Sequence, residues 1–557
     1  MKVIKKSNAM IWRQLIFLFV AVGLFGTGGY AVPKKSYDIV IYGGGSAGFI
    51  AAIQAAKLGK QVALLEPSQH LGGMNIEGLG GTDIDNHAEF QNSLAVGGLA
   101  LEFYRRIAKT YGRAHEFEDM VSKKAKRFDL WRFEPHIAQQ VIDQWVAEYP
   151  IAVFYGARLK EKRGVEKAGN RIKRIHLDDG QSFVSKVFID ASIEGDLLFH
   201  AGVSTAVGRE SNSQYGETNN GIRGETTHAQ FAVKVDPYKV PNDPHSGLIS
   251  TIVADELGTP GDGDNYIQAY CFRMCLTKDK ENQIAFSKPE SYDRNDYEIY
   301  LRYLRAGGKL YVPQVSIPNG KTDLGAWHDL SHNLYGMNRG YPEGGYALRD
   351  SILRYHRNFT QGLFYFLAND REVGQLDGAL QKEWASWGLA KDEFLDNGGW
   401  PRQFYVRDGR RMVSDFVITE HHIRQLEPAL LPHPVAMAFW PPDLHSVRRI
   451  VKDGYAYNEG FVFGGDWWRP FGIPYEAIVP KSSECTNLIT ASCPSSSHVA
   501  YGAIRIEFTF MALGQASAVA ASLAIDGKKP VQDVPYVQLQ KILLEEKAVL
   551  HLPETIN

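Results

Sequence analysis

The sequence predicts an α/β fold in which helices cover a mostly parallel sheet, with an α+β lobe inserted into the fold. Three observations support this prediction. Residues 37–42 are a β-rich run that leads into a glycine-rich loop and then into an alanine-rich helical stretch at 49–58. A second β-type run, 61–65, ends at a glutamate, and a helix of small residues returns at 506–525. A strand, a helix and a second strand within about 30 residues have the length of a βαβ unit.

The loop after the first strand has the glycine spacing of a dinucleotide-binding turn. Gly43 permits a tight turn, Gly45 removes a side chain where a pyrophosphate must approach, and Gly48 lets helix and strand pack closely. The helix that follows offers free N–H groups and the positive end of its dipole to phosphate. We therefore expect a nucleotide to bind at this turn, which consists of Gly43, Gly44, Gly45, Ser46, Ala47 and Gly48.

The end of the second strand indicates which nucleotide binds. Glu66 is placed to accept hydrogen bonds from both ribose hydroxyls, and its carboxylate would repel a 2′-phosphate, which favours FAD or NAD over NADP. Gly72 and Gly73, followed by Met74, form a Gly-Gly pair that a NAD domain does not need. Many flavoproteins place such a pair against the pyrophosphate and the flavin end of FAD. FAD is therefore the predicted cofactor, bound by a Rossmann-type domain.

The rest of the chain divides around this unit. β-type runs at 171–177 and 182–188 flank Asp178-Asp179-Gly180, which is a hairpin signal. From about 206 the sequence becomes rich in Gly, Pro, Trp and Tyr and shows little regular periodicity, which predicts loops with some helices, for example around 349–369. We predict an FAD-binding part at 37–205, an inserted substrate or cap lobe at 206–470, a further part with a small-residue helix at 471–530 and a C-terminal tail at 531–557.

Several segments resemble the FAD-dependent oxidoreductase family, a branch of the glutathione-reductase-type flavoproteins that is often found in exported bacterial proteins. These segments are 37–74, 189–196 and 491–521, and in the middle of the chain 275–279 and 405–412. Some relatives are described as iron–sulfur proteins. This sequence lacks the cysteine clusters that such a cofactor needs, so the resemblance is not extended to it.

The resemblance implies a split FAD domain of the glutathione-reductase type and roles for three residues. Asp190 would end a strand of the second half of the dinucleotide fold, and Asp196 would lie near the FAD diphosphate or ribityl chain. Leu159 would contact adenine through its backbone.

The stretch 493–505, just before the last helix, is the candidate for chemistry. In flavoproteins of this build the final helix points its N-terminus at the N1/C2=O edge of the flavin, and the small-residue run around Gly514 and Gln515 would allow close packing there. His498 is the candidate general base and Arg505 a candidate to stabilise anionic flavin or hold a substrate oxygen. The alternatives are a packed, backbone-bonded His498 and an Arg505 paired with a carboxylate such as Glu507.

The predicted function is hydride transfer from a small organic substrate to flavin N5, with an electron acceptor that the sequence does not specify. The alternative is an exported nucleotide-fold binding protein without catalysis. A NAD dehydrogenase would need a second glycine-rich turn with the spacing of 43–48, or direct binding of NAD by Glu66. The sequence has no second turn of this kind. Six tryptophans could stack on the sugar rings of a carbohydrate-derived substrate, or they could be buried in the core. They are Trp384, Trp387, Trp400, Trp440, Trp467 and Trp468.

Composition argues against several other classes. Lys and Arg total 61 against 63 Asp and Glu, a net charge of −2, so nothing electrostatic points to nucleic acid as a partner. Four cysteines in 557 residues are too few for a disulfide framework, and we expect buried or free thiols, with one disulfide as the main alternative. No metal site is predicted, because the adjacent His421 and His422 would point to different faces of a helix.

The N-terminus has the order of a secretory signal peptide. Lys2, Lys5, Lys6 and Arg13 precede an apolar run at 15–25, and small residues follow up to Ala31. The run is short for a transmembrane helix, which needs about 20 residues. We therefore expect a signal peptide over 1–31 and a secreted or periplasmic protein. Membrane association is expected only if this segment stays uncleaved as an anchor, which is the alternative.

Overall fold

A seven-stranded, mostly parallel sheet organises the first half of the fold in the computed structural model, which describes residues 35–424, 431–465 and 467–552. β1 (Lys35–Tyr42) lies between β2 and β6, parallel to both, and β3 extends the sheet beyond β2. β18 joins β6 in parallel, while β5 pairs antiparallel with the start of β6 and β4 with β5. The bounds are Val62–Glu66 (β2), Ile151–Tyr155 (β3), Val165–Ala168 (β4), Arg171–His176 (β5), Ser182–Asp190 (β6) and Leu488–Thr490 (β18).

The register brings the carboxyl ends of the central strands together. Tyr42 of β1 is opposite Leu65 of β2 and Asp190 of β6, and Thr490 of β18 is also opposite Asp190. Loops that follow these strands therefore meet at one edge of the sheet, which is where ligands bind in open α/β sheets. The parallel sheet confirms the predicted α/β, Rossmann-type fold class. β18 adds to β6 from a distant part of the sequence.

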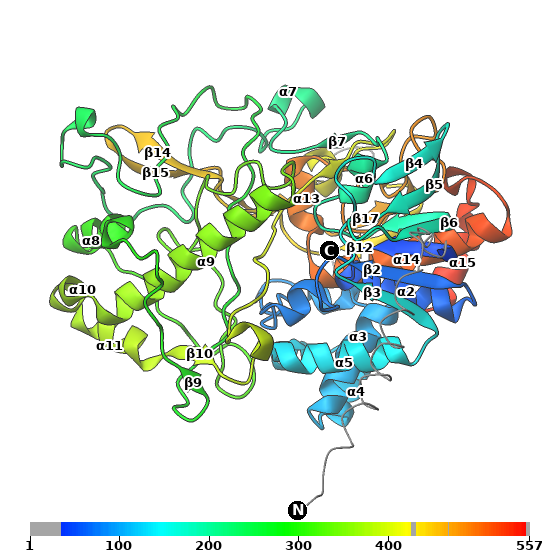
Figure 1. The fold of residues 1–557 in the computed structure, drawn as a ribbon, viewed down its shortest axis with the longest axis horizontal. Coiled ribbons are helices and arrows are strands. Elements are labelled where there is room, and N and C mark those ends of the chain that lie inside the picture. The colour runs from blue at the N-terminus through cyan, green and yellow to red at the C-terminus, as the bar shows by residue number, and fades with distance from the viewer. Residues whose placement is uncertain (1–34, 425–430, 466, 553–557) are drawn as a thin grey trace, which may run out of the picture.

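Two helices from opposite ends of the chain pack against each other beside this sheet (Figure 1). They are α2 (Ser46–Lys57) and α14 (Glu507–Asp526). A Cβ on Gly514 of α14 would overlap the backbone carbonyl of Ala47 in α2, so the glycine is what permits this approach. α14 is the one described helix that is long and apolar enough to cross a membrane, and 83% of its most apolar stretch is buried inside the protein. It is therefore a core helix.

Further helices complete this core. α3 (Gly98–Thr110), α4 (Ala114–Lys123) and α5 (Pro135–Ala147) lie together below the sheet in Figure 1, and α15 (Tyr536–Glu545) packs on α14 through Leu539 and Leu543. The segment predicted as a C-terminal tail thus contributes a packed helix. The apolar stripes of α3 and α5 face the same buried cluster as α2, so the helices stabilise the face of the sheet on which the glycine turn lies.

A second body, here called the cap lobe, has its own apolar core and lies on the green side of Figure 1. Its longest helix is α9 (Tyr346–Asn369), which matches the helix predicted around 349–369. The other elements are α8 (Glu298–Arg305), α10 (Arg371–Leu376), α11 (Gly378–Ser386), β8 (Leu276–Thr277), β9 (Gln283–Ile284), β10 (Gly388–Ala390), β14 (Arg448–Lys452) and β15 (Tyr455–Glu459).

Part of the segment predicted as the inserted lobe packs into the core of the first domain. Val435 and Ala436 of β12 belong to that core, and β12 (Pro434–Ala438) pairs with β17 (Phe471–Pro474). Ala456 of β15, which lies between β12 and β17 in the sequence, belongs to the core of the cap lobe. The remaining short elements are α6 (Asp196–His200), β7 (Thr205–Ala206), α7 (Asn212–Tyr215), β11 (Arg411–Met412), α12 (Glu420–Arg424), β13 (Asp443–Leu444), β16 (Val462–Phe463) and α13 (His498–Ile504). The chain therefore crosses between the two bodies more than once.

Candidate cofactor-binding site

The glycine turn lies where the sequence places it, between the end of β1 and the start of α2. Gly43 has a φ of +96°, and a Cβ there would lie 2.6 Å from the backbone nitrogen of Ser192. A Cβ on Gly48 would overlap the carbonyl oxygen of Gly43, so helix and strand approach closely at this point. α2 begins without a side-chain cap, which leaves its N-terminal N–H groups for a ligand.

Glu66 closes one end of the site. Its carboxylate accepts hydrogen bonds from the backbone nitrogens of Gly44 and Ser68, each at 2.6 Å, and burial raises its pKa. The carboxylate thus stands directly beside the glycine turn, at the end of the strand next to β1. This is the position from which an acidic side chain binds the ribose of a dinucleotide.

The N-termini of α2 and α14 converge on the same point. The hydroxyl of Ser46, the first residue of α2, donates a hydrogen bond to the carboxylate of Glu507, the first residue of α14, and accepts one from the Asn75 amide at 2.7 Å. Burial raises the pKa of Glu507 to about 7. Glu507 was expected only as a possible partner for Arg505, and nothing local in the sequence shows that it meets Ser46 across the fold.

One continuous cavity of about 340 Å³ joins these features, and it extends from the glycine turn to the cap lobe. This volume is within the range of ligand-binding sites. Of the predicted residues, ten line it: Gly43, Gly44, Gly45, Ser46, Ala47, Glu66, Gly73, Met74, Asp196 and Arg505. Lining residues that the sequence did not indicate include Glu77, Arg158, Tyr346, Arg349, Tyr405 and Glu507.

Asp190 and Asp196 have different roles in the structure. Asp190 is fully buried and accepts hydrogen bonds from the Ser192 backbone and hydroxyl and from the Leu198 backbone, so it shapes the turn after β6 without lining the cavity. Asp196 lines the cavity and forms two 2.7 Å hydrogen bonds with Arg349 of the cap lobe. Burial opposes ionisation of Asp196, but Arg349 outweighs it and lowers the pKa of this carboxyl.

Arg505 and Tyr405 also line the cavity, at what is here called the Arg505 end, and Asp443 contacts Arg505 without lining the cavity itself. Arg505 is buried, lines the cavity and donates a 3.0 Å hydrogen bond to the Tyr405 hydroxyl. Its guanidinium also lies 3.2 Å from a carboxylate oxygen of Asp443 and donates to the Asp443 carbonyl. Arg505 therefore pairs with a carboxylate, which was the alternative to a role in chemistry, and this carboxylate is Asp443 and not Glu507. Arg505 also faces the cavity.

His498 does not line the cavity. It begins α13, its backbone nitrogen donates to Glu210 at 2.9 Å, and its ring Nδ1 lies 3.3 Å from a carboxylate oxygen of Asp408. The candidate stretch 493–505 contains a helix from 498 to 504, and the Ser497 side chain caps this helix by accepting a hydrogen bond from the backbone of Ala500. The position of this serine in the sequence was a usable signal for that helix.

Five other predicted cofactor residues also lie outside the lining of the cavity: Gly48, Gly72, Leu159, Gly514 and Gln515. Gly48 and Gly514 act through close backbone packing. The Leu159 backbone is not free for adenine, because its N–H donates to Tyr42 and its carbonyl accepts from Tyr346. The Gln515 side chain accepts from the backbone of Leu99 and donates to a side chain of α2, so it ties three helices together.

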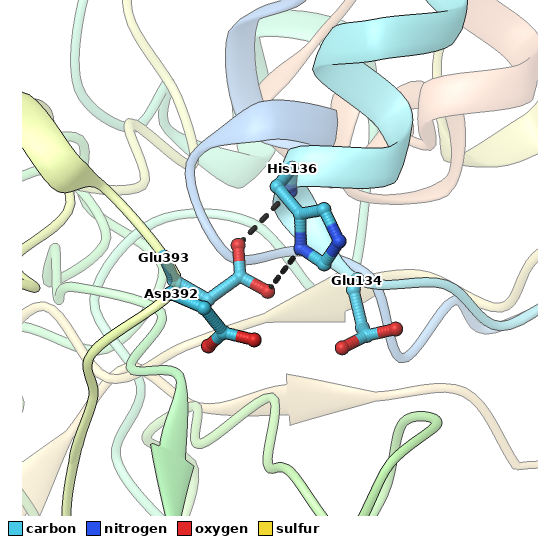
Figure 2. Close-up of side chains that lie close together, drawn as sticks. All are labelled: Glu134, His136, Asp392 and Glu393. Atoms are coloured by element: carbon cyan, nitrogen blue, oxygen red, sulfur yellow. Dashed lines mark hydrogen bonds and ion pairs between the residues drawn. The ribbon is translucent and has the colours of Figure 1, made fainter. Parts of the chain in front are cut away.

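A cluster of acidic residues and a histidine at the junction of the two bodies has the residue types of a metal site (Figure 2). It consists of Glu134, His136, Asp392 and Glu393, and His136 bonds Glu393 through its ring and its backbone. The ammonium of the buried Lys321 lies 2.7–2.8 Å from oxygens of all three carboxylates. A cation thus already neutralises the cluster, which acts as an ionic contact between α5 and the cap lobe.

The glycine turn, the carboxylate after β2 and the converging helix N-termini define a Rossmann-type dinucleotide-binding protein. The cavity continues past the turn, along Gly73 and Met74, to the cap lobe, which fits a cofactor longer than its adenosine half. The model of a family described as FAD dependent oxidoreductase matches residues 38–543. The chain belongs to this family, and FAD is its cofactor.

Similarity to individual proteins covers smaller parts of the chain. The 4-oxocyclohexanecarboxylate 2-dehydrogenase of Sinomonas cyclohexanicum is 32% identical over 107 residues, which are 19% of this chain and 18% of that protein. The L-proline dehydrogenase structure from P. horikoshii is 17% identical, with 32% of this chain and 59% of that chain covered and a TM-score of 0.23. The structure of the L-amino acid deaminase from Proteus vulgaris is 17% identical, with 34% of this chain and 55% of that chain covered and a TM-score of 0.22. The chain spans less than two thirds of each of these relatives.

Proposed function

We propose that the protein oxidises a small, carbohydrate-derived substrate by removing a hydride at the Arg505 end of the cavity. The observation that supports this is the continuity of the cavity from Glu66 and the glycine turn to Tyr405 and Arg505. FAD, when bound, supplies the acceptor for the hydride. The protein must then orient the substrate, exclude water and take up a proton. Hydroxyl groups suit this end, because Arg505 lines it with a guanidinium that can donate hydrogen bonds.

Arg505 is suited to hold a substrate oxygen. It is buried and charged, and its contacts with Asp443 and Tyr405 fix the direction of its guanidinium. A fixed positive charge in a water-poor site favours an oxygen that is losing its proton. Arg505 thereby lowers the cost of removing the hydroxyl proton when the adjacent carbon loses its hydride.

Two histidines compete for the role of proton acceptor. Neither His498 nor His445 lines the cavity. His445 lies with its Nε2 3.7 Å from the carboxylate of Asp443, the residue that also holds Arg505. Its Nδ1, like both ring nitrogens of His498, is buried without a hydrogen-bond partner in the described part of the chain. Burial, together with nearby arginines, holds the pKa of His445 well below its usual value, so the ring is neutral at pH 7 and is a weak base. We favour His445 because it contacts Asp443, the residue that holds Arg505.

The choice of base is tested by replacing each histidine with alanine and measuring anaerobic flavin reduction in single turnovers. His445→Ala should keep its FAD and lose reduction rate by about 10²-fold, the scale of general-base catalysis. His498→Ala serves as the matched comparison and should keep both its FAD and its rate. The reverse result would return the role to His498.

The function itself is tested with the visible spectrum of the purified protein. We expect flavin absorption bands that bleach anaerobically with at least one compound in a panel of sugars, alcohols and amines. A flavin that bleaches with dithionite but with no organic substrate would favour the alternative, a nucleotide-fold binding protein without catalysis. A colourless, folded protein that gains no thermal stability from added FAD would refute the proposal. The electron acceptor is a separate question for the same assay.

We also propose that the protein is exported. The segment expected to be a signal peptide, 1–31, lies outside the described residues, so the sequence alone supports this proposal. Mass spectrometry of protein from an exporting host should give a mature chain that begins at Val32, in a secreted or periplasmic fraction. An intact N-terminus in the membrane fraction would instead support an uncleaved anchor.

A further inference from the structure

Glu507 lies beside both the glycine turn and Tyr405, in the cavity that fits the cofactor. Its carboxylate accepts a hydrogen bond from the Ser46 hydroxyl, and all three of these residues line the cavity. Burial raises the pKa of the Tyr405 hydroxyl, and the charge of the nearby Glu507 adds to that rise. Since the adenosine half of FAD binds at Glu66 and the turn, we expect the half that carries the flavin ring to occupy the part of the cavity that Glu507 lines.

Among the described residues, Glu507 is the lining carboxyl group that has neither a cation nor a backbone N–H group as its partner. Five other carboxyl groups line the cavity, and each has an arginine or backbone N–H groups beside it. They are Glu66 (the N–H groups of Gly44 and Ser68), Glu77 (Arg402), Asp350 (Arg158), and Asp196 and Glu194 (both Arg349). In the described part of the chain, Glu507 forms no ion pair, and the Ser46 hydroxyl is its one hydrogen-bond donor. Its negative charge therefore lacks the compensation that the other five have.

The surroundings of Glu507 favour its neutral, protonated form. Burial raises its pKa to about 7, although the hydrogen bond from Ser46 opposes this rise. The titratable groups next to it are the hydroxyls of Tyr104 and Tyr405, which stay protonated because burial raises their pKa as well. FAD would displace water from the cavity when it binds, and loss of water disfavours a carboxylate further. A modest change in the charge of the cavity is thus enough to decide the protonation of Glu507.

Reduction of FAD supplies such a change. Two electrons and one proton, which together make a hydride, add one negative charge to the bound cofactor. In a site that excludes water, this charge and a carboxylate beside it repel each other more strongly than they would in water. A repelling neighbour raises the pKa of a carboxyl group, so reduction favours the protonated form of Glu507. The other lining carboxyl groups should respond less, because an arginine or N–H donors stabilise their charge.

We propose that Glu507 takes up a proton from solvent when the bound FAD is reduced and releases it when the FAD is reoxidised. Two electrons and one proton go to the cofactor, and a second proton goes from solvent to the carboxylate, so reduction adds no net charge to the cavity. The hydroxyl proton of a substrate is a separate proton, and its acceptor is His445. The inference goes beyond the proposed function, because any two-electron donor adds the same charge whatever the substrate.

The test measures the midpoint potential of the FAD-loaded protein, without substrate, by reduction with dithionite and mediator dyes at intervals from pH 6 to 9. Each proton taken up shifts a two-electron potential by about 30 mV per pH unit. Above about pH 7, wild type should show the two-proton dependence and Glu507→Gln the one-proton dependence. Glu507→Asp keeps a carboxyl group and should keep the two-proton dependence over a shifted pH range. Glu545→Gln removes a charge from an exposed position of α15 and should match wild type.

Equal pH dependence in wild type and Glu507→Gln overturns the inference. If Glu507→Gln does not retain FAD, wild type and Glu507→Asp are compared by two measurements across the same pH range. An indicator dye reports total proton uptake, and the absorption spectrum reports the charge of the reduced flavin. Two protons per two electrons with a negatively charged flavin place one proton on the protein, and a shifted pH range in Glu507→Asp assigns it to this position.

The remaining outcomes of that comparison overturn the inference: uptake of one proton, uptake of two protons with a neutral flavin, or an uptake that Glu507→Asp leaves unchanged. The proposed function fails separately, because the reductant here is not a substrate. A flavin that no sugar or alcohol reduces would refute the proposed oxidation and would leave the proton uptake of Glu507 as measured.

Discussion

Replacing Glu507 by glutamine tests a charge that is buried where the two nucleotide-facing helices meet. Glu507 accepts a hydrogen bond from Ser46, and glutamine keeps an oxygen that can accept the same bond. The start of a helix normally favours an anionic side chain. Burial outweighs that effect here and raises the pKa from its ordinary value of 4.5 to about 7. The variant therefore removes a proton-binding site while leaving the local contacts in place.

The sign and size of the effect follow from linkage. Between pH 4.5 and about 7 the folded protein keeps a proton on Glu507 that the unfolded chain has lost, so the free energy of unfolding falls as pH rises. Each pKa unit corresponds to about 1.4 kcal/mol, so the whole shift amounts to about 3 kcal/mol. The contribution of Glu507 is fully present below pH 4.5 and is lost as pH rises through about 7. Glutamine does not titrate and loses nothing.

The measurement is urea unfolding of the apoprotein at intervals from pH 4.5 to 8. The stability difference between Glu507→Gln and wild type should shift by about 3 kcal/mol in favour of the variant as pH rises, with a plateau above pH 7. Glu545→Gln, at an exposed position of α15, controls for the loss of one negative charge. A difference that stays constant with pH would show that Glu507 ionises normally and would refute the reasoning.

Three further predictions concern the same framework. Gly48→Ala should abolish FAD binding or soluble folding, because a Cβ would overlap the Gly43 carbonyl, whereas Gly378→Ala meets open space and should retain full flavin absorbance; equal flavin content would contradict the close approach. Glu66→Gln should weaken FAD affinity about tenfold in fluorescence titrations, because one acceptor for the ribose becomes a donor; unchanged affinity would remove Glu66 from the site. Lys321→Met should destabilise the protein by about 3–5 kcal/mol, seen as a lower melting temperature, since three carboxylates lose their buried cation. An unchanged melting temperature would show that the cluster is not held by this lysine.

The parts of the site that were predictable from sequence are those fixed by local backbone geometry. Gly43 is required by a tight turn and Gly48 by a close contact between helix and strand, and both lie within six residues. The spacing of the two glycines alone therefore predicts this local structure. Glu66 is predictable because a strand ends there, and the strand was evident from its composition. The helix expected at 506–525, which is α14, was also evident from its composition. Its observed bounds differ from the prediction by one residue at each end.

The residues that were not predictable are brought to the site by contacts between distant segments. Tyr405, Asp443 and His445 lie in stretches without regular periodicity, and only the packing of the cap lobe places them next to Arg505. The family resemblance implied that the Leu159 backbone contacts adenine. In the structure that backbone is hydrogen-bonded to Tyr42 and Tyr346. Both outcomes reflect tertiary contacts, which no local pattern in one sequence records.

The pairing of α2 with α14 has a consequence for how the protein matures. The two helix starts that bond through Ser46 and Glu507 are encoded some 460 residues apart, so the ribosome finishes almost the entire polypeptide before they can meet. A chain cut short anywhere before α14 has the glycine turn but lacks the helix that packs against it. Loading with FAD would then report that synthesis was completed.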